Sequence, residues 1–242
     1  MRMDRVVIIT GAGGGLGRAL ARGVAARGDI AVGIGRDAAA LAETGAGLDR
    51  FDARVADVAD FTGLEHTIGE AIAQHGRVDG LFANAAIYPR GLLADQPVDV
   101  LMRVLAVNVG GVAAAIRAVL PTMMDRAHGR IITVGSFADR GPLPDSAAYS
   151  ASKGALHALT KAVAAEVGAD YPDLLVNEWV PGGLATRMGL AEGHAPEHAA
   201  PWGLALLDLP PGGPTGQIFN EDRMEEPVLG LRQRVLKKLR LA

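Results

Sequence analysis

The sequence contains no cysteine and few aromatic residues. Phe, Trp and Tyr together make up 4% of its 242 residues. Without cysteine, a disulfide framework and a thiolate metal site are both excluded. The chain begins MRMDRVVIITG, without a long apolar leader, and no run approaches the ~20 apolar residues that span a bilayer, because glycines and charges interrupt every candidate. We therefore expect a cytoplasmic protein without a membrane partner.

The chain also lacks an excess of charge of either sign. It has 24 Lys and Arg against 27 Asp and Glu, and its formal net charge is -3. Proteins that bind nucleic acid carry a basic surface that displaces counterions, so nucleic acid is not an expected partner. A chain of 242 residues can bury one large core, and α/β domains commonly reach this length, which favours a single domain.

What the sequence does contain is a regular alternation of short apolar runs with stretches of helical periodicity. Strands are expected at residues 6–9, 30–34, 53–58, 78–86, 129–136 and 174–180, with helices after the first strand and at 64–73, 98–120 and 149–167. Parallel neighbours require crossovers, so this order predicts an α/β fold of Rossmann type, a doubly wound parallel sheet in a single domain. Ligands of such sheets bind outside the carboxyl ends of the strands.

A glycine-rich turn, TGAGGGLGR, joins the first strand to the first helix. It does not fit the dinucleotide fingerprint G-x-G-x-x-G, because leucine or arginine occupies each place where the last glycine would fall. Gly11, Gly15 and Gly17 nevertheless allow close approach to a pyrophosphate and leave a helix N-terminus open to an anion. Thr10 can cap or brace the turn. Taken alone, this turn is equally consistent with phosphate binding and with a simple reversal of the chain.

A second motif, YSASK, places Tyr149 and Lys153 four residues apart on an expected helix. Residues at this spacing lie on one helix face, so the ammonium can stand beside the phenol. A neighbouring cation favours phenolate and is expected to lower the pKa of Tyr149 from its usual ~10 toward a range useful in proton transfer. Taken alone, this spacing is explained more often by an exposed helix that carries Tyr and Lys by chance than by a catalytic pair.

Together the two motifs resemble the short-chain dehydrogenase/reductase family, which uses the spacing G-x-x-x-G-x-G. The resemblance covers residues 4–222. It implies a catalytic set of Asn108, Ser136, Tyr149 and Lys153. It also implies a cofactor-binding set of Thr10, Gly11, Gly15, Leu16, Gly17, Arg36, Asp57, Val58, Asn84, Ala85, Tyr149, Lys153, Pro181, Gly182, Leu184 and Thr186.

By the same resemblance, the protein interconverts an alcohol and a carbonyl with a nicotinamide cofactor. Tyr149 would protonate the substrate oxygen, Ser136 would hydrogen-bond it, and Lys153 would lower the Tyr149 pKa and bind the ribose. Asn108 and a water would relay the proton. Matching positions assign the substrate pocket to Tyr88, Ser136, Leu143, Gly183 and Met188. This mainly apolar lining favours a ketone or aldehyde with a hydrophobic body.

The end of the second strand bears on the choice of cofactor. Relatives that prefer NAD carry an acidic residue where this chain has Gly35, and the next residue, Arg36, can pair with a 2'-phosphate. We therefore favour NADP(H). NAD(H) stays open, with Asp37 contacting the ribose or Arg36 simply solvated.

Several positions depart from the family pattern or suggest other chemistry. Glu178 and Trp179 stand where small and aliphatic residues are usual, and Ala83 and Ala86 replace the first Asn and the Gly of N-N-A-G. The pattern His194-x-x-x-His198 contains Pro196, which disfavours an aligning helix, so we expect a loop and no metal. Arg140 can meet an anionic substrate or, more simply, lie in solvent.

The least regular segment, 189–216, is rich in Pro and Gly and is expected to form loops over the site, with a small substrate loop at about 187–213. We thus assign residues 1–222 to the dinucleotide-binding catalytic domain and 223–242 to a basic amphipathic tail that packs on its own fold or on a neighbouring subunit. Apolar surface around much of the helices at 98–120 and 149–167 predicts a homodimer or homotetramer.

Two other functions remain open at this point. The chain can be a regulator or scaffold that binds NADP without turnover, although its catalytic residues would then be idle. It can also be an isomerase or dehydratase acting on nucleotide sugars, as larger relatives are, but 242 residues leave little room for the added substrate domain.

Overall fold

The computed structural model describes residues 4–189 and 192–226. The strands are β1 (Val6–Thr10), β2 (Ile30–Gly35), β3 (Phe51–Val55), β4 (Gly80–Ala83), β5 (Gly129–Val134), β6 (Leu174–Val180), β7 (Ile218–Asn220) and β8 (Arg223–Met224). The α-helices are α1 (Gly15–Ala26), α2 (Ala38–Gly45), α3 (Phe61–His75), α4 (Val98–Leu105), α5 (Gly111–Asp125), α6 (Ala147–Gly168) and α7 (Pro196–Ala205). Three short helical turns, η1 (Ala106–Gly110), η2 (Phe137–Asp139) and η3 (Leu206–Asp208), complete the described secondary structure.

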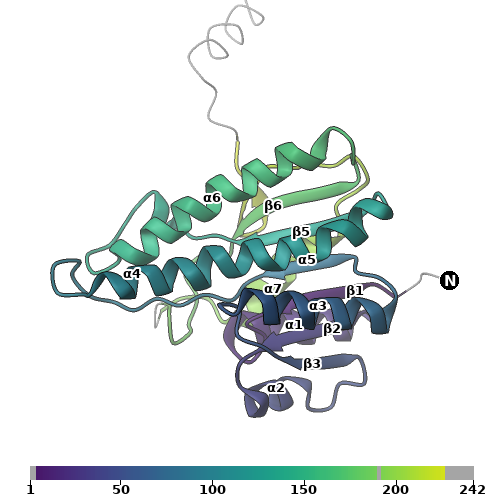
Figure 1. Cartoon of the computed structure of the whole chain (residues 1–242), viewed down its shortest axis with the longest axis horizontal. Coiled ribbons are helices and arrows are strands. Elements are labelled where there is room, and N and C mark those ends of the chain that lie inside the picture. Colours follow the sequence, from purple (N-terminus) through teal and green to yellow (C-terminus); the bar gives the residue numbers. More distant parts are fainter. Residues whose placement is uncertain (1–3, 190–191, 227–242) are drawn as a thin grey trace, which may run out of the picture.

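The strands form a single sheet in the order β3-β2-β1-β4-β5-β6-β7-β8, parallel except for the antiparallel pair β7 and β8. The helices cover both of its faces (Figure 1). This arrangement confirms the predicted doubly wound α/β fold in one domain. The strand order reverses between β1 and β4, and the crevice at such a reversal is where these sheets bind ligands.

Each face of the sheet has its own hydrophobic core. On one face, the core contains Leu64 of α3, Ile116 of α5 and Leu156 of α6. On the other, it contains Leu20 of α1 and Leu204 of α7. Strand residues alternate between the two cores because successive side chains point to opposite faces. The nearly continuous apolar runs of the sequence are therefore those of a sheet buried on both sides.

The helix expected over residues 98–120 is longer and interrupted. It runs from Val98 to Asp125 as α4, the π-helical turn η1 and α5. By length and composition this stretch could cross a membrane, which the sequence analysis did not expect of any segment. Half of its most apolar part is buried inside the fold, as in the core helices of many soluble proteins, so this is weak evidence for a membrane span.

The prediction of loops throughout residues 189–216 is wrong. Pro196 begins α7 at its first helical position, where the missing N–H of proline costs nothing. The helix packs against α1 instead of covering the site, with a leucine methyl of Leu204 only 2.5 Å from where a Cβ on Gly23 would lie. Trp179 explains part of this packing, because its buried ring lies against Gly203 and its indole N–H donates to the Glu221 carbonyl at 3.0 Å.

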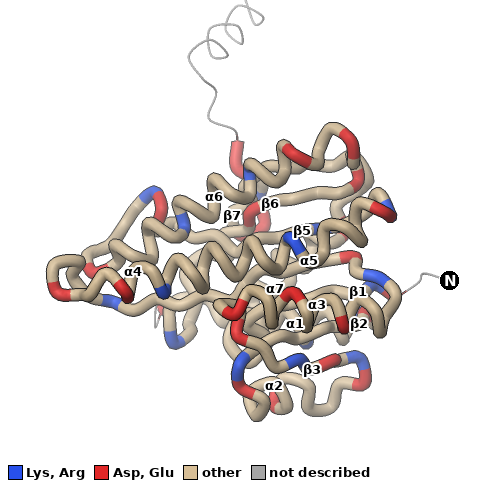
Figure 2. The backbone as a smooth tube through the Cα atoms, viewed as in Figure 1, with Lys and Arg blue, Asp and Glu red and all other residues tan. Residues whose placement is uncertain are grey.

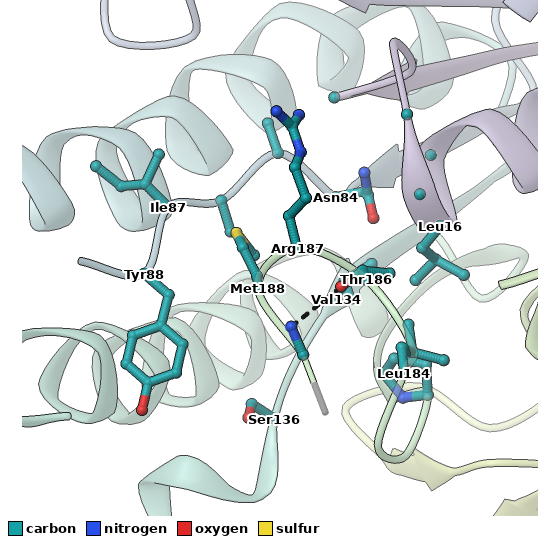
Figure 3. Close-up of a pocket in the computed structure, with 18 of the residues that line it drawn as sticks. Leu16, Asn84, Ile87, Tyr88, Val134, Ser136, Leu184, Thr186, Arg187 and Met188 are labelled. Atoms are coloured by element: carbon teal, nitrogen blue, oxygen red, sulfur yellow. Dashed lines mark hydrogen bonds between the residues drawn. The ribbon is translucent and has the colours of Figure 1, made fainter. Parts of the chain in front are cut away.

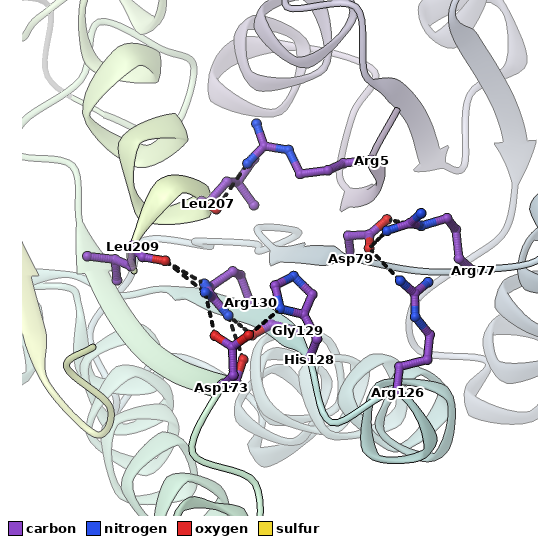
Figure 4. A network of polar contacts seen from close by, with 10 residues as sticks. All are labelled: Arg5, Arg77, Asp79, Arg126, His128, Gly129, Arg130, Asp173, Leu207 and Leu209. Atoms are coloured by element: carbon purple, nitrogen blue, oxygen red, sulfur yellow. Dashed lines mark hydrogen bonds and ion pairs between the residues drawn. The ribbon is translucent and has the colours of Figure 1, made fainter. Parts of the chain in front are cut away.

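A polar network ties the amino ends of the central strands together (Figure 4), whereas ligands of such sheets bind at the carboxyl ends. Asp79, 2% exposed, accepts hydrogen bonds from the Val6 N–H and from the Arg77 guanidinium. The buried Arg130 donates to the Leu209 carbonyl and to the Asp173 carboxylate. Burial acts to raise the pKa of Asp173, but hydrogen bonds from His128 and Arg130 outweigh it and lower that pKa.

Acidic and basic residues are interspersed along the described backbone, and in the view of Figure 2 neither sign gathers on one group of elements. β8, at Arg223–Met224, extends the sheet just past the domain limit expected at residue 222. The rest of the expected amphipathic tail, residues 227–242, lies outside the described residues.

Candidate active site

A cleft of about 1190 Å³ lies at the carboxyl ends of the central strands. Ser136 and Tyr88 lie at one end of it, and Leu16 and Leu184 at the other (Figure 3). Nearly all predicted site residues line this cleft: Gly11, Gly15, Leu16, Gly17, Arg36, Asp57, Val58, Asn84, Ala85, Tyr88, Ser136, Leu143, Tyr149, Lys153, Pro181, Gly182, Gly183, Leu184, Thr186 and Met188. Thr10 and Asn108 do not, although each braces the residues that do.

The glycine turn has the geometry of an anion cradle. Gly11 and Gly15 have positive φ angles of 72° and 50°. A Cβ on Gly17 would lie 2.1 Å from the Gly11 carbonyl oxygen, so only glycine fits there. Gly14 precedes α1 without a side-chain cap, which leaves the first amides of the helix available to a pyrophosphate. The residues present therefore fit the dinucleotide that the resemblance implies.

Thr10 braces the turn from behind. Its hydroxyl accepts hydrogen bonds from the backbone N–H groups of Asn84 and Ala85, both at 3.0 Å, and the Asn84 side-chain amide donates to the Thr10 carbonyl. These bonds join the ends of β1 and β4 at the point where the strand order reverses. Thr10 acts on the backbone, which is the bracing alternative of the sequence analysis.

The residues after β2 and β3 form the far end of the cleft. Asp57 accepts a hydrogen bond from the Ala59 N–H and one from Arg103, and the Arg36 guanidinium lies 3.9 Å away. Burial acts to raise the pKa of Asp57, but these neighbours outweigh it and lower that pKa. Asp37 uses its carboxylate to cap α2 by accepting from the Ala40 N–H at 3.1 Å. β3 ends at Val55, so Asp57 stands in the turn after the strand, not inside it as expected.

Ser136, Tyr149 and Lys153 converge near the Tyr88 end of the cleft. Ser136 follows β5, and its hydroxyl lies close enough to the Tyr149 phenol to act on the pKa of that phenol. Lys153 is 3% exposed, its ammonium donates to the Val134 carbonyl at 2.7 Å, and it lies 5.5 Å from the centre of the Tyr149 ring. The Tyr149 and Lys153 side chains project from the same face of α6, because they are four residues apart. The structure thus brings together the three groups that the sequence predicted to be chemically active.

The pKa of Tyr149 is raised in this structure, and the expected lowering by Lys153 is wrong for this arrangement. Burial of the phenol is the largest cause, the nearby Ser136 hydroxyl partly opposes it, and Tyr88 adds to the rise. The Lys153 ammonium lies over the Tyr149 ring and donates a hydrogen bond to the Val134 carbonyl, so it is not paired with the phenol oxygen. Burial lowers the pKa of Lys153 to about 8, which still leaves this ammonium mostly charged at neutral pH.

Asn108 lies one layer behind the cleft, in the π-helical turn between α4 and α5. Its side-chain oxygen accepts from the Ile87 N–H, and its amide donates to the Ile87 carbonyl and to the Ser152 hydroxyl. These bonds fix Ile87 beside Tyr88 and Ser152 beside Lys153. The side chain is therefore fully engaged in positioning, and the predicted water relay stays a prediction. π-Helical turns recur at functional sites.

Two arginines that the sequence analysis missed, Arg90 and Arg187, line the cleft with the predicted Tyr88. Tyr88 stacks on Tyr149 with ring centres 4.3 Å apart, and the Arg90 guanidinium lies 5.0 Å from the centre of the Tyr88 ring. Arg187 extends into the cleft from the loop that carries Thr186 (Figure 3). The signals available in the sequence were weak, a basic residue directly after Thr186 and another two positions after Tyr88.

Two features to which the sequence analysis gave no functional role, the His194 and His198 pair and Arg140, have partners in the structure. The rings of His194 and His198 stack at 5.1 Å, against the expectation that Pro196 would prevent their alignment, and both meet Trp202 edge to face. Within residues 4–189 and 192–226, no group of three or more His, Asp or Glu side chains is placed to hold a metal ion. Arg140 lies exposed to solvent, which agrees with the simpler expectation, and its guanidinium also pairs with Glu225 at 2.7 Å.

Comparisons with known proteins agree with this geometry. The family model for short chain dehydrogenase matches residues 5–196. The chain is 37% identical to 2-(R)-hydroxypropyl-CoM dehydrogenase of Xanthobacter autotrophicus, over 77% of each chain. It is 32% identical to meso-2,3-butanediol dehydrogenase of Serratia marcescens, over 78% of this chain and 75% of that one.

Among solved structures, a 3-ketoacyl-(acyl-carrier-protein) reductase from Brucella melitensis, complexed with NADH, matches with a TM-score of 0.81 and 26% identity. The match covers 89% of this chain and 96% of that chain. One explanation accounts for the fold, for the glycine spacing and for the cluster of Ser136, Tyr149 and Lys153. The chain belongs to the short-chain dehydrogenase/reductase family of NAD(P)-dependent oxidoreductases.

Proposed function

We propose that this protein is an NADP(H)-dependent oxidoreductase that interconverts a hydrophobic ketone or aldehyde and the corresponding alcohol, with Tyr149 as the general acid and base. The observation that carries this proposal is the convergence of Ser136, Tyr149 and Lys153 at one end of a cleft whose other walls fit a dinucleotide. The absence of cysteine supports a cytoplasmic setting.

The proposed mechanism assigns one task to each side chain. When bound, the nicotinamide cofactor supplies the hydride for reduction or accepts it in oxidation. Ser136 donates a hydrogen bond to the substrate oxygen, and Tyr149 breaks its O–H bond to protonate that oxygen as negative charge develops there. The Lys153 ammonium compensates the phenolate that remains. A raised Tyr149 pKa keeps the phenol protonated at neutral pH, which favours the reductive direction there.

The preference for NADP(H) is supported by how the two candidate residues after β2 are used. Asp37 is engaged as the cap of α2, so its carboxylate is not directed at a ribose. Arg36 has a side chain that is 62% exposed on the cleft wall and is held only loosely, 3.9 Å from Asp57. A planar guanidinium in this position can pair with a 2'-phosphate through two hydrogen bonds.

The hydrophobic substrate is supported by the lining of the Tyr88 end of the cleft. Leu143 and Met188 are 59% and 38% exposed, and Ile87 and Tyr88 add apolar surface. Named relatives act on alcohols or on a ketoacyl group, which agrees with a carbonyl or alcohol substrate. A small body with an apolar part fits this lining better than a sugar does.

A screen of carbonyls and alcohols, read at the nicotinamide absorbance with both cofactors, tests the activity. The Tyr149→Phe variant removes only the proton donor, so it should lose at least about 10²-fold in kcat while keeping its cofactor affinity. Ser150→Ala, one residue along the same helix, is the matched control. Unchanged kcat in Tyr149→Phe would overturn the assignment of Tyr149.

The cofactor preference is tested separately with Arg36→Ala. Loss of a charged pair to the 2'-phosphate should lower kcat/KM with NADPH by about 10-fold or more and leave kcat/KM with NADH nearly unchanged. Arg223→Ala, which removes an exposed arginine far from this cleft wall, should change neither value. A wild-type protein that strongly prefers NADH would contradict the proposal.

A further inference from the structure

A buried carboxylate that the mechanism does not use lies close to the proposed active site. Glu178 is in the middle of β6 and is 2% exposed. Alternation along the strand places it on the same face as Val176, which belongs to the core under α3, α5 and α6. Carboxylates are rarely buried to this degree unless they are paired, so the position of Glu178 calls for a partner.

The partner of Glu178 is His157. The His157 Nδ1 and the Glu178 Oε2 are 2.7 Å apart, and the histidine is partly exposed while the glutamate is not. Tyr149, Lys153 and His157 occur at intervals of four residues on α6, and they therefore form one row along the helix. His157, the partner of Glu178, thus continues the row on α6 that begins with the proposed proton donor, Tyr149.

The second carboxylate oxygen of Glu178 reaches the backbone that carries the catalytic serine. A Cβ on Gly135 would lie 2.1 Å from the Glu178 Oε1, so the carboxylate occupies the space that any other residue at 135 would fill. Gly135 connects Ser136 to Val134, whose carbonyl accepts the Lys153 hydrogen bond. The carboxylate therefore packs against the backbone segment that accepts the Lys153 hydrogen bond.

The charged groups around the Lys153 ammonium come from three elements. Glu178 approaches from β6 and Asp139 from η2, and both favour the charged ammonium, whereas burial of Lys153 is the larger and opposing effect on its pKa. Asp139 also lies 3.5 Å from the Arg140 guanidinium. On α6 itself the titratable neighbours in the row are Tyr149 and His157.

Beyond these residues, Arg140 is paired with Glu225, which follows β8. Burial raises the pKa of Glu178, and the hydrogen bond from His157 opposes this rise. His157 thereby favours the carboxylate form of Glu178, and that carboxylate favours the ammonium form of Lys153. The direction of coupling is the same at both steps.

We propose that Glu178 and His157 are positioning residues that keep Lys153 charged and thereby set the upper pH limit of turnover. The inference deepens the proposed function and rests on it, because the Lys153 charge is taken to act on turnover by compensating the phenolate of Tyr149. Neither residue touches the substrate oxygen; both act through Lys153.

The direct test is the titration of Lys153 itself. The chain has only four lysines, at positions 153, 161, 237 and 238, so a protein labelled with 13C at lysine Cε gives few NMR signals, and Lys153→Met identifies the one to follow. In Glu178→Gln the Lys153 midpoint should fall by about 1 pH unit below that of the wild type, because an opposite charge nearby is removed. Glu166→Gln, an exposed carboxylate on the same helix, should leave the midpoint in place.

The pH profile of kcat/KM for carbonyl reduction gives the second reading. Its alkaline limb should move to lower pH in Glu178→Gln by the same amount, with rates within about threefold of wild type well below that limb. His157→Ala should shift the limb in the same direction by less, and His157→Gln, which retains a donor, should restore it in part. If Glu178→Gln fails to fold, the two His157 variants carry the test.

The outcomes separate this inference from the proposed function. A Lys153 midpoint that is unchanged in Glu178→Gln, or in both His157 variants where Glu178→Gln does not fold, overturns the inference. A shifted midpoint with an unmoved alkaline limb shows that the pair holds the charge but does not set the pH range, which overturns it as well. Absence of turnover on every carbonyl and alcohol tested overturns the proposed function, while the NMR titration still decides the coupling.

Discussion

Lys153 carries its charge in the interior of the protein, which is costly for folding. Burial lowers its pKa from 10.5 to about 8, so the folded chain holds this proton less tightly than the unfolded chain does. The cost is fully present below pH 8 and disappears above pH 10.5, because both states are then neutral. A shift of this size corresponds to about 3 kcal/mol at neutral pH. Only a residue needed for function is expected to persist at such a cost.

We predict that Lys153→Met abolishes turnover and yet stabilises the fold. Methionine fills similar space without a charge, which removes the cost of about 3 kcal/mol. Loss of the hydrogen bond to Val134 destabilises the fold by about 1 kcal/mol, so the free energy of unfolding at pH 7 should rise by about 2 kcal/mol. Urea unfolding at pH 7 and at pH 10 measures this, and the gain should shrink at the higher pH. Lys161→Met, on the exposed side of the same helix, should change stability little. A destabilised Lys153→Met would contradict the argument.

At the scale of the element, the turn from β1 into α1 shows why the spacing of glycines matters more than their number. Gly17 must be glycine because the Gly11 carbonyl lies where its Cβ would be. Gly14 has an extended backbone with φ of -175°, and nothing lies within 4 Å of where a Cβ on it would be. The two glycines therefore have different roles in one short stretch.

This difference predicts opposite outcomes for two alanine substitutions. Gly17→Ala should weaken NADPH binding by at least about tenfold and lower the melting temperature, because an overpacked backbone contact costs about 1–3 kcal/mol. Gly14→Ala should change the NADPH affinity by less than about threefold. Fluorescence titration with NADPH and thermal unfolding measure both effects, and equal losses in the two variants would show that the contact at Gly17 does not control the turn.

The elements that departed from expectation did so for local reasons. Helical periodicity from Val98 onward predicted one helix, but the π-helical turn inserts a different hydrogen-bond pattern around Asn108. Proline density suggested loops near Pro196, whereas proline at the first helical position is favourable. Neither effect changes the hydrophobic pattern, which is why periodicity alone could not detect it.

At the scale of the whole molecule, α6 presents a row of small exposed residues on the side away from its own core. Leu156 and Val163 are buried inside the subunit, and the exposed row consists of Ala151, Ala155, Ala158 and Ala162. Small side chains allow two helices to approach closely, so we predict that this row packs against a second copy of the chain in a homodimer or homotetramer.

Light scattering at micromolar concentration tests this assembly. The wild type should exceed the mass of one chain, 25.0 kDa, and Ala158→Arg should reduce that mass because a long cation replaces a close contact. Ala73→Arg, an exposed position on α3, should leave the mass unchanged. A monomeric wild type would contradict the prediction.

Much of the site could be read from the sequence because its key groups lie close together along the chain. The spacing of Gly11, Gly15 and Gly17 and the four-residue interval from Tyr149 to Lys153 express turn and helix geometry directly. The parallel sheet likewise follows from the alternation of short apolar runs with helices, since parallel strands need crossovers. These features are local, and local geometry is encoded in the order of residues.

Only the tertiary structure decided the interactions that join distant segments. It pairs Glu178 on β6 with His157 on α6, engages Asn108 with Ile87 and Ser152, and places Lys153 on the Val134 carbonyl. It also reverses the expected direction of the Tyr149 pKa, because burial depends on everything packed around the phenol. Burial and pairing are properties of the assembled layers, so the sequence determined which chemical groups this protein has, and the packing of sheet against helix decided their charges and their neighbours.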